Sequence, residues 1–89
     1  MSDEKTSSLT FPCDFPIKIV GKSSLDFQAA VLSIIRKHAP DLGEAAVVER
    51  HSKDSTYLSL TVTVHAHSQA QLDAIYQDLS AEPSVIMAL

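Results

Sequence analysis

The sequence YLSLTVTVHAH, residues 57–67, is the most regular stretch of the chain. Apolar and polar residues alternate along it, which predicts a β-strand over 57–66 with one face toward a core and one face open. The inward positions are Leu58, Leu60, Val62, Val64 and Ala66. The outward positions are Tyr57, Ser59, Thr61, Thr63, His65 and His67. The polar face of this strand is therefore a candidate functional surface.

The flanking sequence predicts three more strands and two helices. The strands are expected at 15–21, 44–52 and 84–89, with a hairpin connection at 53–56. The helices are expected at 22–40 and 68–80, where apolar residues recur every three or four positions. Ser23 or Ser24 is suited to cap the first helix, and Ser68 with Gln71 forms a capping-box pattern at the second.

This order, βαββαβ, predicts an α+β ferredoxin-like fold with a four-stranded antiparallel sheet. Each helix has one apolar stripe, so both helices should cover the same face of the sheet. Right-handed crossovers place the third strand between the first and second, and the fourth outside the first. Residues 1–10 are expected to be a flexible tail, and 11–89 a single domain.

Composition excludes several classes of function. The formal net charge is −4, and the basic residues are scattered along the sequence, which disfavours nucleic acids and anionic membranes. No apolar run approaches the length of a membrane helix, and the N-terminal residues do not resemble a signal peptide. The one cysteine, Cys13, forms no internal disulfide, and a cytoplasmic location is expected.

The segment VGKSS, residues 20–24, is a candidate anion site. Free N–H groups and the dipole at a helix start favour negative charge, and Lys22 adds a cation. The ligand-binding residues are predicted to be Gly21, Lys22, Ser23 and Ser24. The segment is not a P-loop, because position 16, where the first glycine belongs, is Pro16. A small carboxylate effector is the expected ligand.

Catalytic and metal chemistry find little support. His65 and His67 lie two apart on one strand and can supply two metal ligands, but no third donor is tied to them by spacing. Cys13 has no adjacent cation to activate it, and no nucleophile–base pattern is recognisable. We therefore expect no enzyme activity, no metal and no cofactor.

Two surfaces are candidates for protein contacts. The open sheet face would present Tyr57, Thr61, Thr63 and His65 to a partner. The last strand, SVIMAL (84–89), would be an uncharged apolar edge, and such edges invite pairing with another strand or a second copy. RNA binding is disfavoured because Tyr57 is the one aromatic residue expected on the open face.

Four segments of the chain resemble the YbeD-like family of small bacterial proteins. They are FPCDFPIKIVG (11–21), RKHAP (36–40), SKDSTYLSLTV (52–62) and VIMAL (85–89). The family's fold is similar to the ACT regulatory domain, a βαββαβ module that binds small effectors and commonly pairs. Some members are described as lipoic acid-binding regulatory proteins, which implies a link to lipoate metabolism. The segment KDST (53–56) departs from the pattern, because it lacks the glycine expected in relatives.

The resemblance places the effector at Gly21–Ser24, in agreement with the helix-start argument. The leading hypothesis is therefore a non-enzymatic regulatory domain that senses a small anionic effector. The alternative hypothesis is a protein–protein interaction adaptor that uses the open sheet face or the C-terminal edge strand.

Overall fold

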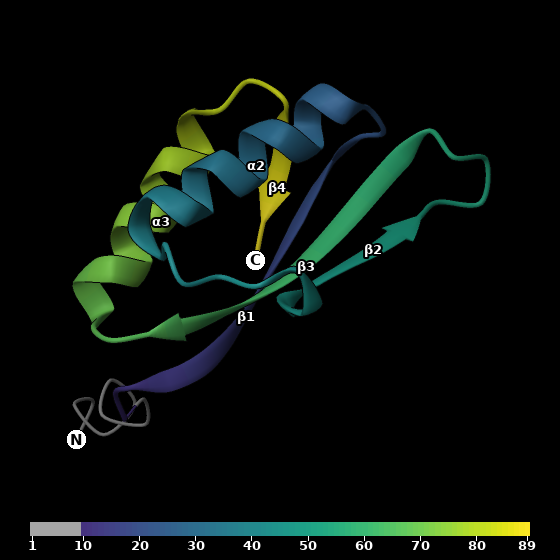
Figure 1. Ribbon diagram of the computed structural model, residues 1–89. Helices are drawn as coiled ribbons and strands as arrows, with labels where there is room; N and C mark the ends of the chain where they lie inside the picture. The colour runs from purple at the N-terminus through teal and green to yellow at the C-terminus, as the bar shows by residue number, and fades with distance from the viewer. Residues whose placement is uncertain (1–9) are drawn as a thin grey trace, which may run out of the picture.

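Four antiparallel strands form one sheet, and both helices lie on the same side of it (Figure 1). The structure, a computed structural model, describes residues 10–89. Its elements are β1 (Cys13–Lys22), α2 (Leu25–His38), the 3-10 turn η1 (Glu44–Ala46), β2 (Val47–His51), β3 (Tyr57–Ala66), α3 (Gln69–Ala81) and β4 (Val85–Ala88). The predicted βαββαβ fold is confirmed, whereas most of the predicted tail lies outside the described residues.

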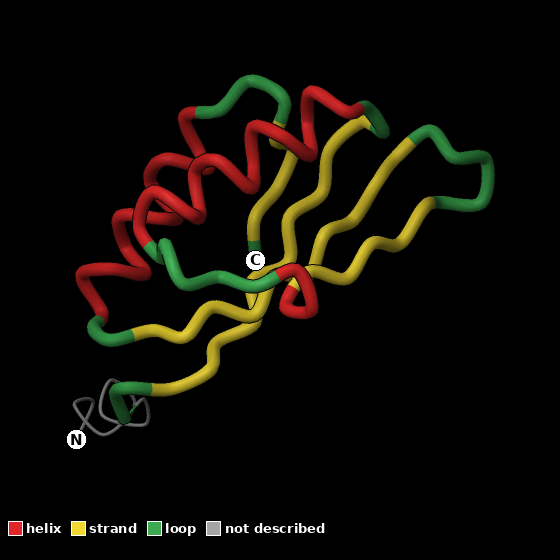
Figure 2. Tube along the Cα trace, in the orientation of Figure 1, coloured by secondary structure: helices red, strands yellow, loops and turns green. Residues whose placement is uncertain are grey.

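The strand order is β2-β3-β1-β4, as the crossover argument predicts. The two long strands, β1 and β3, pair over their full length, from Cys13 opposite Ala66 to Lys22 opposite Tyr57. Figure 2 shows the two short strands on the outside of this central pair. Because the register is continuous, the alternation seen in the sequence of β3 also fixes which residues of β1 face the helices.

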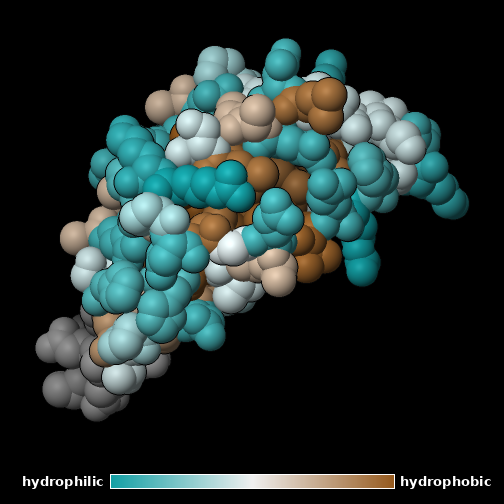
Figure 3. Space-filling view, in the orientation of Figure 1, coloured by the Kyte–Doolittle hydropathy of each residue, from teal (hydrophilic) through white to brown (hydrophobic). Residues whose placement is uncertain are grey.

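The core lies between the sheet and the helices. The sheet contributes the inward residues of β3 together with Ile17 and Ile19 of β1, all of them buried. The helices contribute Phe27, Val31, Ile35, Leu72, Ile75 and Leu79. In the view of Figure 3, hydrophilic residues cover most of the surface and apolar residues gather in its middle. One face of the sheet is therefore covered, and the other is left open.

Several element boundaries differ from the prediction. Strand β1 begins at Cys13 and runs to Lys22, so the first helix starts only at Leu25, with the Ser24 hydroxyl accepting a hydrogen bond from Phe27 N. Residues 44–46 form a 3-10 turn, and β2 is correspondingly shorter than predicted. At α3, the Ser68 hydroxyl accepts from Gln71 N, but the Gln71 side chain accepts from His67 N rather than from Ser68.

The two outer strands cover the same half of the central pair. Strand β2 pairs with Leu58–Val62 of β3, and β4 pairs with Ile19–Gly21 of β1. The other half is a two-stranded ribbon that extends toward the first turn of α3 (Figure 1). Pro16 suits this position. The N–H and C=O of Lys18 bond to Leu89, so the backbone nitrogen and carbonyl of residue 16 point to the same side, where no described strand pairs with it. Proline, which has no N–H, is tolerated at such an edge.

A polar cluster joins the two helices at their exposed side. Asp78 Oδ2 lies 2.7 Å from His38 Nε2 and 3.4 Å from Lys37 Nζ. The Gln71 amide also donates to the carbonyl oxygen of His38 at 2.9 Å. The hydrogen bond from His38 and, less strongly, the contact with Lys37 lower the pKa of Asp78 below its ordinary value.

Candidate functional site

The four predicted ligand-binding residues do not converge on one pocket. Gly21 is buried in the core, where a Cβ would clash with the Phe27 ring and lie 2.5 Å from the Ser84 carbonyl oxygen. Lys22 is exposed and lies opposite Tyr57, on the face of β1 that points away from the helices. The glycine thus has a packing role, and the lysine belongs to the open sheet face.

Ser23 and Ser24 line a shallow cavity of about 330 Å³ between the start of α2 and strand β2. The Ser24 hydroxyl already caps the helix, which leaves fewer free donors for a ligand. The same cavity is lined by Glu49 and His51, whose side chains lie 3.9 Å apart. A carboxylate in the lining works against anion binding. The anion site therefore stays a prediction without geometric support from Lys22.

The four residues of the predicted interaction face do lie on one side of the sheet. They are Tyr57, Thr61, Thr63 and His65, which alternate with the buried residues of β3. His65 Nδ1 lies 3.0 Å from the Asp14 carboxylate, and its ring meets that of His67 edge to face, with centroids 5.0 Å apart. Within residues 10–89 no three His, Cys, Asp or Glu side chains are grouped so as to hold a metal ion.

The sheet brings together cations that are scattered in the sequence. On the open face, Lys18 of β1 lies opposite Thr61 of β3, and Arg50 of β2 lies opposite Ser59 of β3. Lys18 and Arg50 line the same two shallow cavities, of about 250 and 220 Å³. Together with Lys22, they give this face a positive charge on a chain whose formal net charge is −4.

Exposed apolar side chains surround these cations. Val48 is 59% exposed, Met87 44% and Leu89 63%. Val48 lies opposite Thr61, Met87 lies opposite Val20, and Leu89 exchanges backbone hydrogen bonds with Lys18. Exposed apolar side chains gathered beside cations make this face a candidate docking surface.

Sequence reasoning missed this combination. The alternation of Lys18 with Ile17 and Ile19 was a usable signal for the lysine, since both isoleucines had to face the core. Arg50 could be placed only with the register of the hairpin, which the sequence does not specify.

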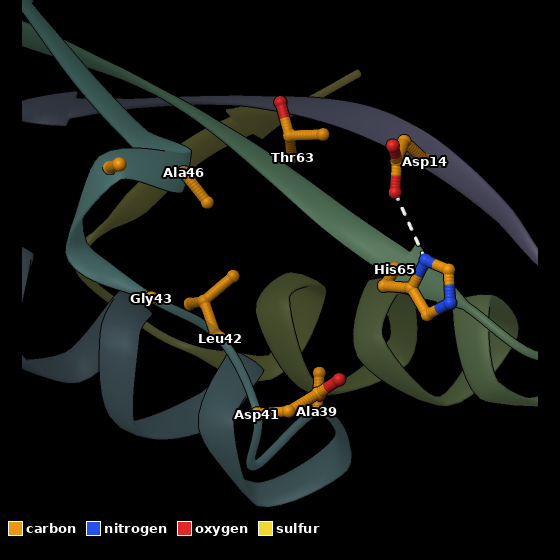
Figure 4. A pocket seen from close by; sticks show the side chains of 9 residues that line it. Asp14, Ala39, Asp41, Leu42, Gly43, Ala46, Thr63 and His65 are labelled. Carbon is orange, nitrogen blue, oxygen red and sulfur yellow. Dashed lines mark hydrogen bonds and ion pairs between the residues drawn. The ribbon is translucent and has the colours of Figure 1, made fainter.

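A further cavity of about 420 Å³ lies beside the ribbon half of the sheet (Figure 4). Thr63 and His65 of β3, with Asp14 of β1, form one side of it. Ala39, Asp41, Leu42 and Gly43, from the connection between α2 and η1, form the other. Polar and apolar residues both line it, and it opens to solvent.

Comparison with known proteins identifies the family of the chain. A family model described as "Protein of unknown function (DUF493)" matches residues 6–89. The chain belongs to this family. DUF493 relatives include a UPF0250 protein of Nitrosomonas europaea, 48% identical over 83 residues and covering 93% of this chain and 95% of the relative. A UPF0250 protein of Chromobacterium violaceum is 47% identical over 89 residues and covers 100% of both chains.

Solved structures agree with the fold of this DUF493 protein. The solution structure of HP0495 from H. pylori has a TM-score of 0.75 at 15% identity, covering 100% of this chain and 93% of that one. The C-terminal domain of MgtC from Mycobacterium tuberculosis has a TM-score of 0.65 at 15% identity, covering 91% and 88%. The family model and the relatives confirm the family resemblance inferred from the sequence. Among residues 10–89, no helix combines the length and the apolar composition needed to cross a membrane.

Proposed function

We propose that this DUF493 protein is a non-enzymatic binding module that docks on an acidic protein partner through its open sheet face. The observation that carries the proposal is the pair Lys18 and Arg50, which share two surface cavities and are flanked by exposed apolar residues. Of the described strand residues on this face, Asp14 is the one acid, and its carboxylate is bonded to His65 at the far end.

The two kinds of residue would contribute differently. Burial of the Val48, Met87 and Leu89 side chains removes apolar surface from water, which favours association. The cations select a partner with carboxylates at the matching positions and speed the encounter, because opposite charges steer diffusion. An acidic chain with a basic face also repels wrong partners over the rest of its surface.

A charge reversal at Lys18 tests the docking face. Tagged wild-type protein is used to capture partners from a lysate of a bacterium that encodes it, in parallel with Lys18→Glu and Lys53→Glu. Lys53 lies in the turn after β2, so its reversal changes net charge equally without altering the open face. We expect a specific partner to be lost with Lys18→Glu and retained with Lys53→Glu. Equal capture by both variants would contradict the proposal.

A second candidate function is the sensing of a small anionic effector, which the family resemblance links to lipoate. It is favoured by the cavity that Ser23 and Ser24 line at the first turn of α2. A ligand at 100 times its dissociation constant would add about 2.7 kcal/mol to the free energy of unfolding. We therefore suggest thermal-shift measurements with amino acids, lipoate and octanoate.

The variant Glu49→Gln sharpens the effector test. If an anion occupies this cavity, removal of the neighbouring negative charge should strengthen binding and increase the rise in melting temperature. Absence of any rise with wild type and with Glu49→Gln would leave the docking module as the remaining hypothesis.

A further inference from the structure

Strand β2 ends its pairing before β3 ends. The β2–β3 ladder stops at Val47 opposite Val62, because residues 44–46 turn away as a 3-10 helix. Strand β3 continues to Ala66 and still pairs with β1 on its other side. From Thr63 onward, the side of β3 that faced β2 is therefore a sheet edge.

The backbone groups of Thr63 and His65 point to this edge. Ser52 N donates to the carbonyl oxygen of Tyr57, which shows that residue 57 directs its N–H and C=O toward β2. In an antiparallel ladder every second residue does the same, so Thr63 and His65 follow Tyr57 in direction. The last pair of the ladder, Val47 opposite Val62, is a non-hydrogen-bonded pair, so it places the Ala46 carbonyl oxygen beside the Thr63 N–H. Ala46 N donates to Gly43 instead, and the ladder does not reach His65, which leaves the Thr63 C=O and the N–H and C=O of His65 at the edge.

The cavity in Figure 4 lies along this edge. Its far wall is the chain from Ala39 to Ala46, which supplies the apolar Leu42 side chain, so an inserted segment would be held on two sides. The span from Thr63 to His65 is about 7 Å, enough for a three-residue extended segment to satisfy the three open groups. Asp14 and Asp41 give the lining an excess of negative charge over the one imidazole.

We propose that this edge binds an extended, basic peptide segment of a partner protein, which adds to β3 as a short extra strand. Main-chain hydrogen bonds to Thr63 and His65 would hold the segment, and a lysine or arginine would face Asp14 or Asp41. Addition of a strand to an exposed sheet edge is a recurring mode of peptide recognition. The segment would bond to the backbone edge of β3 beyond Val62, whereas the docking surface around Lys18 uses side chains of the open face, so the two proposals are tested separately.

Amide hydrogen exchange, read by NMR on the full chain, tests the edge itself. In the free protein, the amide of His65 should exchange fast, whereas those of Val62 and Val64, which bond to β1, should exchange slowly. Slow exchange at His65 in dilute protein would overturn the proposal. Protection that grows with protein concentration would overturn it too, because a second copy would then fill the edge.

Binding is tested with the peptide acetyl-Lys-Val-Lys-Val-Lys-amide and its glutamate counterpart. We expect the lysine peptide to shift the Thr63 and His65 amide signals saturably and to slow the exchange of His65, and the glutamate peptide to do neither. Asp41→Asn should weaken the lysine peptide about threefold, the effect of one exposed ion pair, while Asp73→Asn on α3 should not. Absence of shifts at millimolar peptide, or equal shifts with both peptides, would overturn the proposal.

Discussion

At the residue scale, packing alone explains why position 21 is a glycine, and no ligand is needed for the explanation. The chain needs a hydrogen atom at this position, because the Phe27 ring and the backbone of Ser84 close over it. Gly21→Ala should therefore lower the free energy of unfolding by about 2–3 kcal/mol, in the range of overpacked cores. Urea denaturation followed by circular dichroism measures the change.

Gly43→Ala is the matched control for this substitution. Nothing lies within 4 Å of a Cβ at Gly43, and its φ of −94° suits any residue. Its stability should stay equal or rise by about 0.5 kcal/mol, through a less flexible unfolded chain. If the Gly21→Ala protein is as stable as Gly43→Ala, the core accommodates a methyl group at position 21.

In the hairpin connection, Ser55 adopts a backbone conformation that glycine takes more readily than serine. Its φ of 63° is the left-handed conformation that side chains disfavour. Ser55→Gly should remove this strain and raise the free energy of unfolding by about 0.5 kcal/mol, after the entropic cost of glycine. Ser55→Ala keeps the strain and should give no gain. Stabilisation by both variants would assign the effect to the lost hydroxyl instead.

At the element scale, the contact between α2 and α3 makes stability depend on pH. The His38 and Lys37 side chains lower the pKa of Asp78 from its ordinary 3.8, so the ionised carboxylate is favoured in the folded state. A lowered carboxyl pKa stabilises the fold above its unfolded value and loses this effect as pH falls through the folded value. The melting temperature should therefore drop as pH falls below about 4.

Asp78→Asn should flatten this part of the pH profile. Asp73→Asn is its control on the same helix, since among the described residues the Asp73 carboxylate bonds to the Gln69 amide and not to a cation. Melting curves between pH 2 and 7 distinguish the two. An unchanged slope in Asp78→Asn would mean that other carboxylates account for the acid sensitivity.

The elements also mark the limit of what the sequence could predict. Alternation at residues 57–66 and the helical stripes determined the fold, because both periods point to one core. The anion site was not resolved in the same way: Lys22 extends β1 and therefore faces away from the first turn of α2. The β3 edge was missed because Glu44–Ala46 turns rather than pairs, and three residues rich in alanine carry no signal for that choice.

At the scale of the whole molecule, the outer edge of β4 remains a candidate site for self-association. Leu89 exchanges backbone hydrogen bonds with Lys18, so the N–H and C=O of Ala88 point outward, and the Ile86 side chain, at the bulge in the β1–β4 pairing, is 56% exposed. An uncharged edge of this kind favours pairing with a second copy about a two-fold axis.

We expect a reversible dimer in sedimentation equilibrium. Ile86→Lys should dissociate it, because charge on an edge blocks strand pairing, whereas Lys18→Glu should leave it intact. A monomer at every concentration would contradict self-association. A dimer broken by Lys18→Glu would mean that the two copies meet at another surface.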